Sequence, residues 1–360
     1  TTVYRTTSAT ADSGTTKIFT WSAWVKRAKS GVAQGLCMNK KSDSNTNQRW
    51  RLYFPANDTL IFENKDSGGT DDVYLATNQL FRDPGAWYHI VLVYDTTQTE
   101  VNRVKIYVNG LSVEDNGGWS VTNRASADFT TNWSSDWEHY IGKMVDDSGT
   151  GSFFDGTMSH VHCTYGTAYQ ASTFGEFDST SGIWTIETSP SVTYGSQGYF
   201  LKMEDRTNLD LDSGTNTLTM STTGTLTATK DCPDDNFAVI TPLNPQSGTD
   251  GDIIHTNANT TIYDNGANWR SAYGTIGDNT GKYYFETKIV GASGNWWVGV
   301  CDSDQVSVTD AKFVAETRGY GTNAAGDRGN SGSEASWTGQ IATAQNGIVM
   351  IAIDMVNGKI

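Results

Sequence analysis

The stretch "WYHIVLVYDTTQTEVNRVKIYVNG" (Trp87–Gly110) contains two apolar runs and ends on an Asn-Gly pair. The first run, Trp87–Tyr94, is apolar on both faces, which is typical of a central strand covered on both sides. In Val104–Val108 every second side chain is branched and apolar, and Asn109-Gly110 supplies the two positive-φ residues of a tight hairpin turn. The segment "IVMIAIDMVNGKI" (Ile348–Ile360) repeats the order of apolar run, Asp and Asn-Gly. Each segment therefore predicts a core strand that leads into a hairpin.

The composition and the other strand signals favour an all-β protein. The 360 residues include 12 Trp, 16 Tyr, 13 Phe and 37 Gly but only 6 Pro, which suits short strands joined by many turns. "IFTWSAWVKR" (Ile18–Arg27) alternates as a strand, and Arg49–Phe54 and Thr59–Asn64 flank a turn-forming "PAND" as in a hairpin. The sequence has no long amphipathic helical pattern, and we expect a short polar helix only at Gln170–Asp178.

The net charge limits the kinds of partner that the chain is expected to bind. The 40 acidic residues exceed the 25 basic ones, the net charge is −15, and no basic cluster exists, so nucleic-acid binding is not expected. No segment approaches the apolar length of a membrane span. The first residues, "TTVYRTTSATADSG", lack the regions of a signal peptide. A signal has therefore been removed, or the protein leaves its cell by another route, for instance inside a virus particle.

Four cysteines, Cys37, Cys163, Cys232 and Cys301, stand far apart and without metal-ligand spacing. We expect them to be buried, unpaired thiols that behave as small apolar residues. Disulfides between distant strands remain an alternative.

The pattern of strands and linkers divides the chain into three parts. We expect residues 1–178 to form a first domain and residues 179–235, which are rich in Ser, Thr and Gly, to form a connector that contributes strands. Within it, Gly198–Asp205 is expected to close the first domain. The strand pattern restarts over residues 236–360, which we expect to form a second domain. The chain stops directly after a hairpin turn, so the natural polypeptide is expected to continue beyond Ile360.

Both parts resemble known families. "FTWSAWVKR", "WYHIVLVYD…RVKIYVNG" and "YIGKM…FFDGTMSHVHC" make residues 1–205 similar to the laminin-G/concanavalin A-like superfamily. "GTIG", "GKYYFETKI", "WWVGVCD" and "IAIDMVNGKI" stand in the order of SPRY domains, over residues 236–360. The resemblance implies two concanavalin A-like antiparallel β-sandwiches of jelly-roll type in tandem.

The tandem order also resembles large structural proteins of tailed bacteriophages. These include tail fibres, adhesins and capsid decoration proteins. The resemblance implies a place on the virion surface and other virion proteins as partners. It also implies host-surface glycans as possible ligands and a homo-oligomeric state. Membrane insertion is not expected.

We expect no enzymatic activity and assign no catalytic residue. Glycoside hydrolases of this fold place paired carboxylates along one strand, typically as Glu-x-Asp-x-Glu. The nearest match, Glu176-Phe177-Asp178, lacks the third acid and lies in a predicted helix or loop, so we interpret it as a solvated pair. His160 and His162 alternate on one strand, a spacing that could ligate a metal, but no acid or Cys completes the set.

Two groups of residues are candidate binding sites. Acidic turns offer hard oxygen ligands for Ca²⁺, although Asp, Ser and Gly also form turns without any ion. Aromatic residues in polar surroundings suit sugar rings, although such rings also anchor loops. The candidate Ca²⁺ ligands are Asp66, Asp71, Asp72, Asp146 and Asp147, and the candidate sugar-binding residues are Trp133, Trp137, Tyr140, Trp269 and Tyr273.

Three functions compete on these grounds. The first is a non-enzymatic virion surface protein whose sandwich loops bind host glycans or other particle proteins. The second is a secreted carbohydrate-binding module or glycan-active enzyme. The third is a SPRY-type protein-interaction adaptor. A fold alone does not choose between them.

Overall fold

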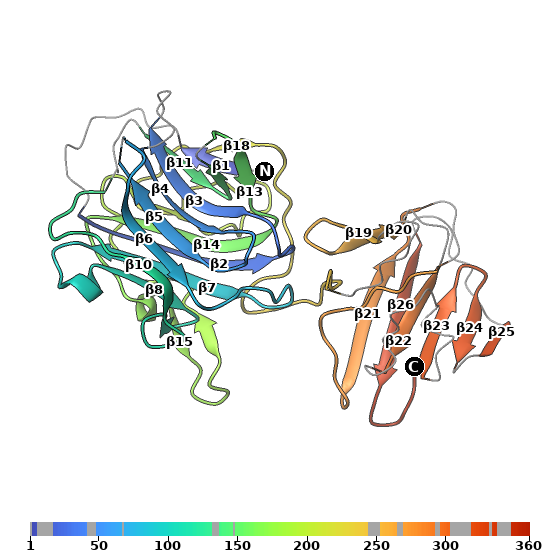
Figure 1. Ribbon diagram of the computed structural model, residues 1–360. Helices are drawn as coiled ribbons and strands as arrows, with labels where there is room; N and C mark the ends of the chain where they lie inside the picture. Colours follow the sequence, from blue (N-terminus) through green and yellow to red (C-terminus); the bar gives the residue numbers. More distant parts are fainter. Residues whose placement is uncertain are drawn as a thin grey trace. The chain divides into compact units, whose positions relative to one another are not determined.

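The computed structural model describes residues 2–5, 17–41, 48–66, 68–131, 137–146, 148–243, 253–264, 269–291, 296–302, 318–330, 333–336 and 347–360. The chain divides into two units, residues 1–237 and residues 238–360 (Figure 1). The described part is all-β apart from two single-turn 3₁₀ helices, as the sequence predicts. None of its helices is long and apolar enough to cross a membrane.

Within its described residues, the first unit contains eighteen strands and both 3₁₀ helices. They are β1 (Thr2–Arg5), β2 (Ile18–Arg27), β3 (Gln34–Lys41), β4 (Arg49–Phe54), β5 (Ile61–Lys65), β6 (Asp71–Thr77), β7 (Tyr88–Asp95), η1 (Glu100–Asn102), β8 (Val104–Val108), β9 (Leu111–Ser112), β10 (Trp119–Asn123), β11 (Trp137–Ile141), β12 (Lys143–Val145), β13 (Gly151–Phe153), β14 (Gly156–Tyr165), η2 (Ala171–Thr173), β15 (Gly175–Phe177), β16 (Trp184–Ile186), β17 (Tyr199–Leu201) and β18 (Ser221–Thr223).

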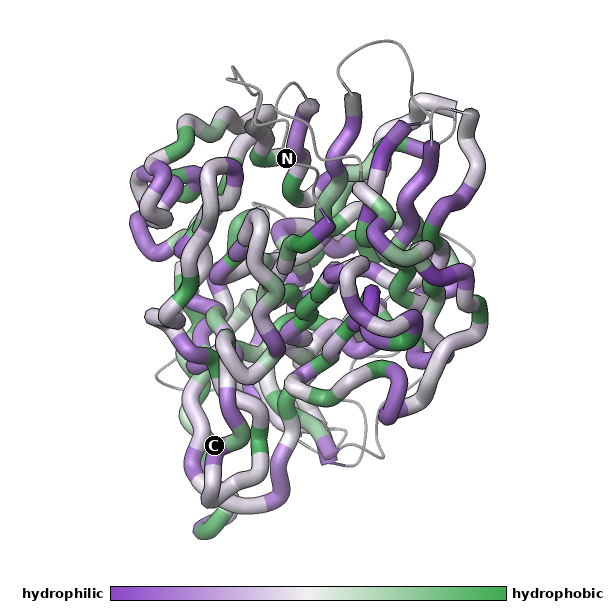
Figure 2. Tube along the Cα trace, turned by 90° about the vertical axis from the view of Figure 1, so that its left-hand side faces the viewer, coloured by the Kyte–Doolittle hydropathy of each residue, from purple (hydrophilic) through white to green (hydrophobic). Residues whose placement is uncertain are grey.

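Two antiparallel sheets form a sandwich in this unit. One sheet has the order β10-β6-β5-β4-β3-β11-β1-β18 and the other the order β17-β14-β2-β7-β8-β9. Hydrophobic and hydrophilic residues are interspersed along the trace (Figure 2), and strands such as β8 turn one face to the interior. Trp50, Leu52 and Phe54 of β4 and Phe19 and Trp21 of β2 belong to one buried cluster. Phe19 stacks on Trp50 across the interior, with 5.2 Å between ring centres.

The opening stretch forms the elements predicted for it. β7 lies between β2 and β8 and is buried on both faces, and β8 buries only Val104, Ile106 and Val108. Asn109 and Gly110 have φ angles of 47° and 79°, and β8 pairs with β9 directly across them. The two-residue hairpin is therefore confirmed.

Gly110 is also needed for its lack of a side chain. A Cβ built on it would lie 2.3 Å from the ring of Trp184. We expect Gly110→Ala to destabilise the first unit by about 2 kcal/mol more than Gly166→Ala, because overpacking adds to the strain of positive φ. Gly166 is a matched control, since its φ is 81° and a Cβ there would meet nothing within 4 Å. If urea unfolding shows the same loss of unfolding free energy for both variants, the Trp184 ring moves aside without cost and the prediction is wrong.

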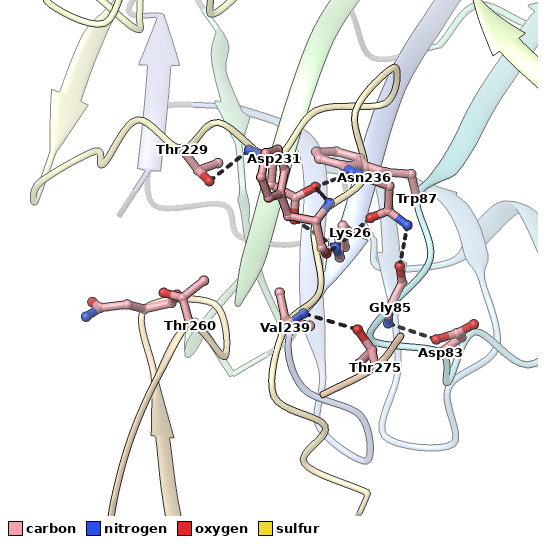
Figure 3. Close-up of polar contacts among 12 residues, drawn as sticks. Lys26, Asp83, Gly85, Trp87, Thr229, Asp231, Asn236, Val239, Thr260 and Thr275 are labelled. Carbon is pink, nitrogen blue, oxygen red and sulfur yellow. Dashed lines mark hydrogen bonds and ion pairs between the residues drawn. The ribbon is translucent and has the colours of Figure 1, made fainter. Parts of the chain in front are cut away.

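The predicted connector, residues 179–235, is grouped with the first unit, and the division falls after residue 237 rather than after 235. Within it, β17 pairs with β14 and β18 pairs with β1. The last segment is held by a buried ion pair between Lys26 and Asp231, 2.7 Å long (Figure 3). The Lys26 ammonium also donates to Asn236 Oδ1 and to the Phe237 carbonyl, so all three of its hydrogens are used. Trp87 Nε1 donates to the other Asp231 oxygen.

The second unit, within its described residues, consists of three antiparallel sheets. Its strands are β19 (Ile253–Thr256), β20 (Thr261–Asp264), β21 (Lys282–Lys288), β22 (Trp297–Cys301), β23 (Gly319–Asn323), β24 (Asp327–Asn330), β25 (Ser333–Ser336) and β26 (Ile348–Asp354). β19 pairs with β20, β21 pairs with β26, and β22 to β25 form a meander in chain order.

The second Asn-Gly pair behaves differently from the first. β26 buries only Val349 and Ile351, so it is amphipathic rather than central. A four-residue turn follows, in which Asp354 and Lys359 exchange two backbone hydrogen bonds and Asp354 Oδ1 accepts the N–H of Asn357. The prediction of a matching tight turn was wrong because the Asp354 side chain closes a longer loop.

The cysteines and the predicted short helix can also be compared with the structure. None of the four cysteines, all of them in the described part of the chain, forms a disulfide: Cys37 and Cys163 are buried, whereas Cys232 and Cys301 are half-buried. The helix predicted at Gln170–Asp178 is one 3₁₀ turn, η2, followed by strand β15. β15 pairs with β16, and this pairing draws the segment out of helical geometry.

Candidate functional site

A pocket of about 390 Å³ lies beside the β15–β16 hairpin of the first unit. Polar side chains dominate its lining, which consists of Ser172, Thr173, Gly175, Glu176, Glu187, Ser189, Pro190 and Ser191. Its four hydroxyl groups can donate and accept hydrogen bonds, and its two carboxylates can accept them. The pocket therefore suits a ligand that is rich in hydroxyl groups.

The hairpin brings the two carboxylates to one face. Glu176 pairs with Thr185, and the N–H of Glu187 donates to the Phe174 carbonyl at 3.0 Å. Glu187 therefore lies diagonally across from Glu176 on the same face. Both side chains are exposed to solvent. The interpretation of Glu176 as a solvated acid fits this geometry, but its partner is Glu187 rather than Asp178.

A buried Ser22–His89 pair resembles a catalytic nucleophile and its base. In this pair, however, the histidine donates a hydrogen bond to the serine instead of accepting one. Trp184 Nε1 donates to His89 Nδ1 at 2.9 Å, so Nδ1 is the acceptor. The neutral ring therefore carries its hydrogen on Nε2 and donates it to Ser22 Oγ, 2.9 Å away. Burial lowers the pKa of His89 to about 3. His89 thus cannot take a proton from Ser22 in this arrangement.

His160 and His162 lie on the same side of β14, since both rings contact Phe200. A bulge separates them from Ser159, and His160 has a φ of 50°. His162 Nδ1 and the Tyr194 hydroxyl are 2.9 Å apart. Within the described residues no group of three or more His, Cys, Asp or Glu side chains could hold a metal ion.

The acidic turns predicted for Ca²⁺ use their oxygens within the loops. Asp66 and Asp146 begin two loops of the same pattern, "DSGGT" and "DDSGT", and Oδ1 of each accepts two backbone N–H groups at 2.8 and 2.9 Å. The hydroxyl of Ser148 also donates to Asp146, and this bond lowers the pKa of the Asp146 carboxyl. These acids shape turns, as the alternative interpretation has it.

The other three Ca²⁺ candidates show no shared ligand geometry. Asp71 lies 3.7 Å from Lys65, and Asp72 accepts a 3.4 Å hydrogen bond from Asn64. Burial, with the charge of Asp66 nearby, raises the pKa of Asp72. Asp147 lies outside the described residues. Ca²⁺ binding stays a prediction.

The structure separates the aromatic candidates for sugar binding. Trp137 is only 5% exposed, so it anchors its strand and offers no open face. Tyr140 is half-buried and contacts Lys143. Trp269 and Tyr273 are half-buried in the second unit, and Trp133 lies outside the described residues. The pocket and Lys143 were not predicted from the sequence. Glu176, which belongs to the nearest match to a paired-carboxylate motif, could have directed attention to the hairpin.

Comparison with known proteins agrees with the sandwich architecture. Residues 2–172, somewhat less than half of the chain, match the family model described as the Concanavalin A-like lectin/glucanases superfamily. The first unit carries a concanavalin A-like domain. No curated protein matches the chain.

Several solved structures are similar to parts of this chain. A putative carbohydrate binding protein from Bacteroides ovatus is 16% identical, with 64% of this chain and 58% of that one covered and a TM-score of 0.38. A native heptameric SAP-like pentraxin from Limulus polyphemus is 14% identical, with coverages of 45% and 68% and a TM-score of 0.31. The Ruminococcus gnavus IT-sialidase CBM40 bound to α2,3-sialyllactose is 12% identical, with coverages of 40% and 72% and a TM-score of 0.30. Likenesses this distant do not identify a ligand for this chain.

Proposed function

We propose that this chain is a non-enzymatic surface protein of a tailed-phage particle whose concanavalin A-like domain binds host-surface glycans. The second unit is proposed to be a SPRY-like sandwich that makes contacts with other particle proteins. The sequence resemblance to phage fibre and decoration proteins supports the location. The polar pocket beside β15 and β16 supports a glycan as the ligand.

The proposal of glycan binding rests on the open pocket, which is lined by hydroxyl groups and two exposed carboxylates. Sugars are bound by several directed hydrogen bonds, and carboxylate acceptors make the strongest of these with hydroxyl donors. Ser172, Thr173, Ser189 and Ser191 add donors and acceptors around Glu176 and Glu187. The inert orientation of Ser22 and His89 supports binding without chemistry.

Binding to an array of bacterial surface glycans tests this proposal. We expect the double variant Glu176→Gln/Glu187→Gln to bind its best glycan about tenfold more weakly, because two charged acceptors are lost. Glu100→Gln, at an exposed acid in η1, is the control and should leave binding unchanged. Unchanged binding by the double variant would refute the pocket as the site.

Two further measurements separate the alternatives. Release of reducing sugar from a bound glycan would indicate an enzyme instead. Images of purified particles should show density for this chain on the tail or the capsid, and its absence from both would contradict the proposed location.

A further inference from the structure

A lysine lies between two aromatic rings on the β12–β13 hairpin. Lys143 pairs with Phe153 across the hairpin, and its Nζ is 5.7 Å from the Phe153 ring centre. The same Nζ lies 4.6 Å from the ring centre of Tyr140. The stem runs over Gly151, where a Cβ would lie 3.4 Å from Lys143 Cε. The ring contacts therefore hold the ammonium in place by cation–π attraction.

Within the described residues, the Lys143 ammonium contacts aromatic rings rather than a carboxylate. In the described part of the chain no carboxylate forms an ion pair with it, although acids outnumber bases 40 to 25. Glu138 instead accepts a hydrogen bond from the Tyr140 hydroxyl.

An apolar surface lies directly beside this cation. Phe153 is 50% exposed, so part of its ring is open to solvent. The ring centre of Tyr4 lies 6.1 Å from that of Tyr140. An exposed ring face next to a free ammonium matches a molecule with an apolar ring face and a carboxylate.

We propose that Tyr140, Lys143 and Phe153 form a site for a carboxylate-bearing sugar. The C–H face of the sugar ring packs on Phe153, and its carboxylate accepts hydrogen bonds from Lys143 Nζ. This inference rests on the proposed function and extends it by naming an acidic glycan. The site is chemically distinct from the Glu176/Glu187 pocket, whose carboxylates repel such a ligand.

The test compares two probes that differ only in charge, an oligogalacturonate and its methyl ester. We expect the wild-type chain to bind the charged form about fivefold more tightly at low salt. Lys143→Met should abolish this preference and Lys143→Arg should retain it. Phe153→Ala should weaken the binding of both forms. Lys29→Met removes an exposed lysine elsewhere and should change nothing.

Equal binding of the two probes, no binding of the charged probe at millimolar concentration, or a preference that survives in Lys143→Met would overturn the inference. An unchanged melting temperature shows that Lys143→Met is folded. The proposed function has a separate readout, since the loss of array binding in Glu176→Gln/Glu187→Gln does not depend on Lys143.

Discussion

Lowering the pH from 7 to about 4.5 is expected to cost the first unit much of its stability, through three buried histidines. Burial lowers the pKa of His89 to about 3 and that of His160 to about 4. The pKa of His162 is also well below its ordinary value, chiefly through burial and then through the charges of His160 and His89. All three rings are therefore neutral in the folded protein at pH 7.

The direction of this pH dependence follows from the number of protons that the folded and unfolded chains bind. Between pH 6.5 and the lowered values, the unfolded chain binds a proton at each histidine and the folded chain does not, so the free energy of unfolding falls as pH falls. His89 and His160 should each contribute a loss of about 2 to 3 kcal/mol at pH 4.5, and the three together a slope of about 4 kcal/mol per pH unit near pH 5. A whole domain is typically stable by only about 5–15 kcal/mol.

Few charged groups oppose this effect. His89 contacts Ser22 and Trp184, which are uncharged, and His162 contacts the Tyr194 hydroxyl. Only His160 has charged neighbours: Glu204 at 3.9 Å raises its pKa and Lys202 lowers it. Acids with lowered pKa, such as Asp58, titrate below their usual 3.8 and therefore outside this window.

Hydrogen exchange of β7 amides in the full chain measures the opening free energy of the first unit at each pH. His89→Gln should reduce the slope near pH 5 by about 1.4 kcal/mol per pH unit, the value for one proton. His255→Gln, in the second unit, should leave this slope unchanged. A flat profile between pH 7 and 5 would contradict the prediction.

Asp231→Ala is expected to destabilise the first unit by about 3–5 kcal/mol, because it leaves the Lys26 ammonium buried without its counter-charge. The side chains of Lys26 and Asp231 are only 3% and 7% exposed. Trp87 Nε1 loses its acceptor in the same variant (Figure 3). The segment that ends in Phe237 is then expected to detach from β2.

Urea unfolding of the full chain, followed by tryptophan fluorescence, measures this loss. The double variant Lys26→Met/Asp231→Leu should recover most of it, because replacing both charges by apolar groups removes the uncompensated ion. Asp128→Ala breaks the exposed Lys17–Asp128 pair and should cost less than about 1 kcal/mol. Similar losses of unfolding free energy in Asp231→Ala and Asp128→Ala would show that burial does not strengthen the Lys26–Asp231 ion pair.

Local signals predicted local structure well. The alternation in Val104–Val108 and the Asn109-Gly110 pair led to a strand and a turn that are both present. Asp66 and Asp146 were correctly placed in turns, because Asp, Ser and Gly close such loops with their own atoms. The same local logic failed at Asn357-Gly358, where the Asp354 side chain supports a longer turn.

By itself the sequence determined the strands, the tight hairpin, the all-β class and the acidic charge, since periodicity and turn chemistry act over a few residues. The tertiary structure alone decided which distant groups meet. Lys26 and Asp231 are 205 positions apart, and the open Lys143 ammonium and the Glu176/Glu187 face depend on strand pairing. Burial and charge compensation are properties of such long-range contacts, and no local pattern specifies them.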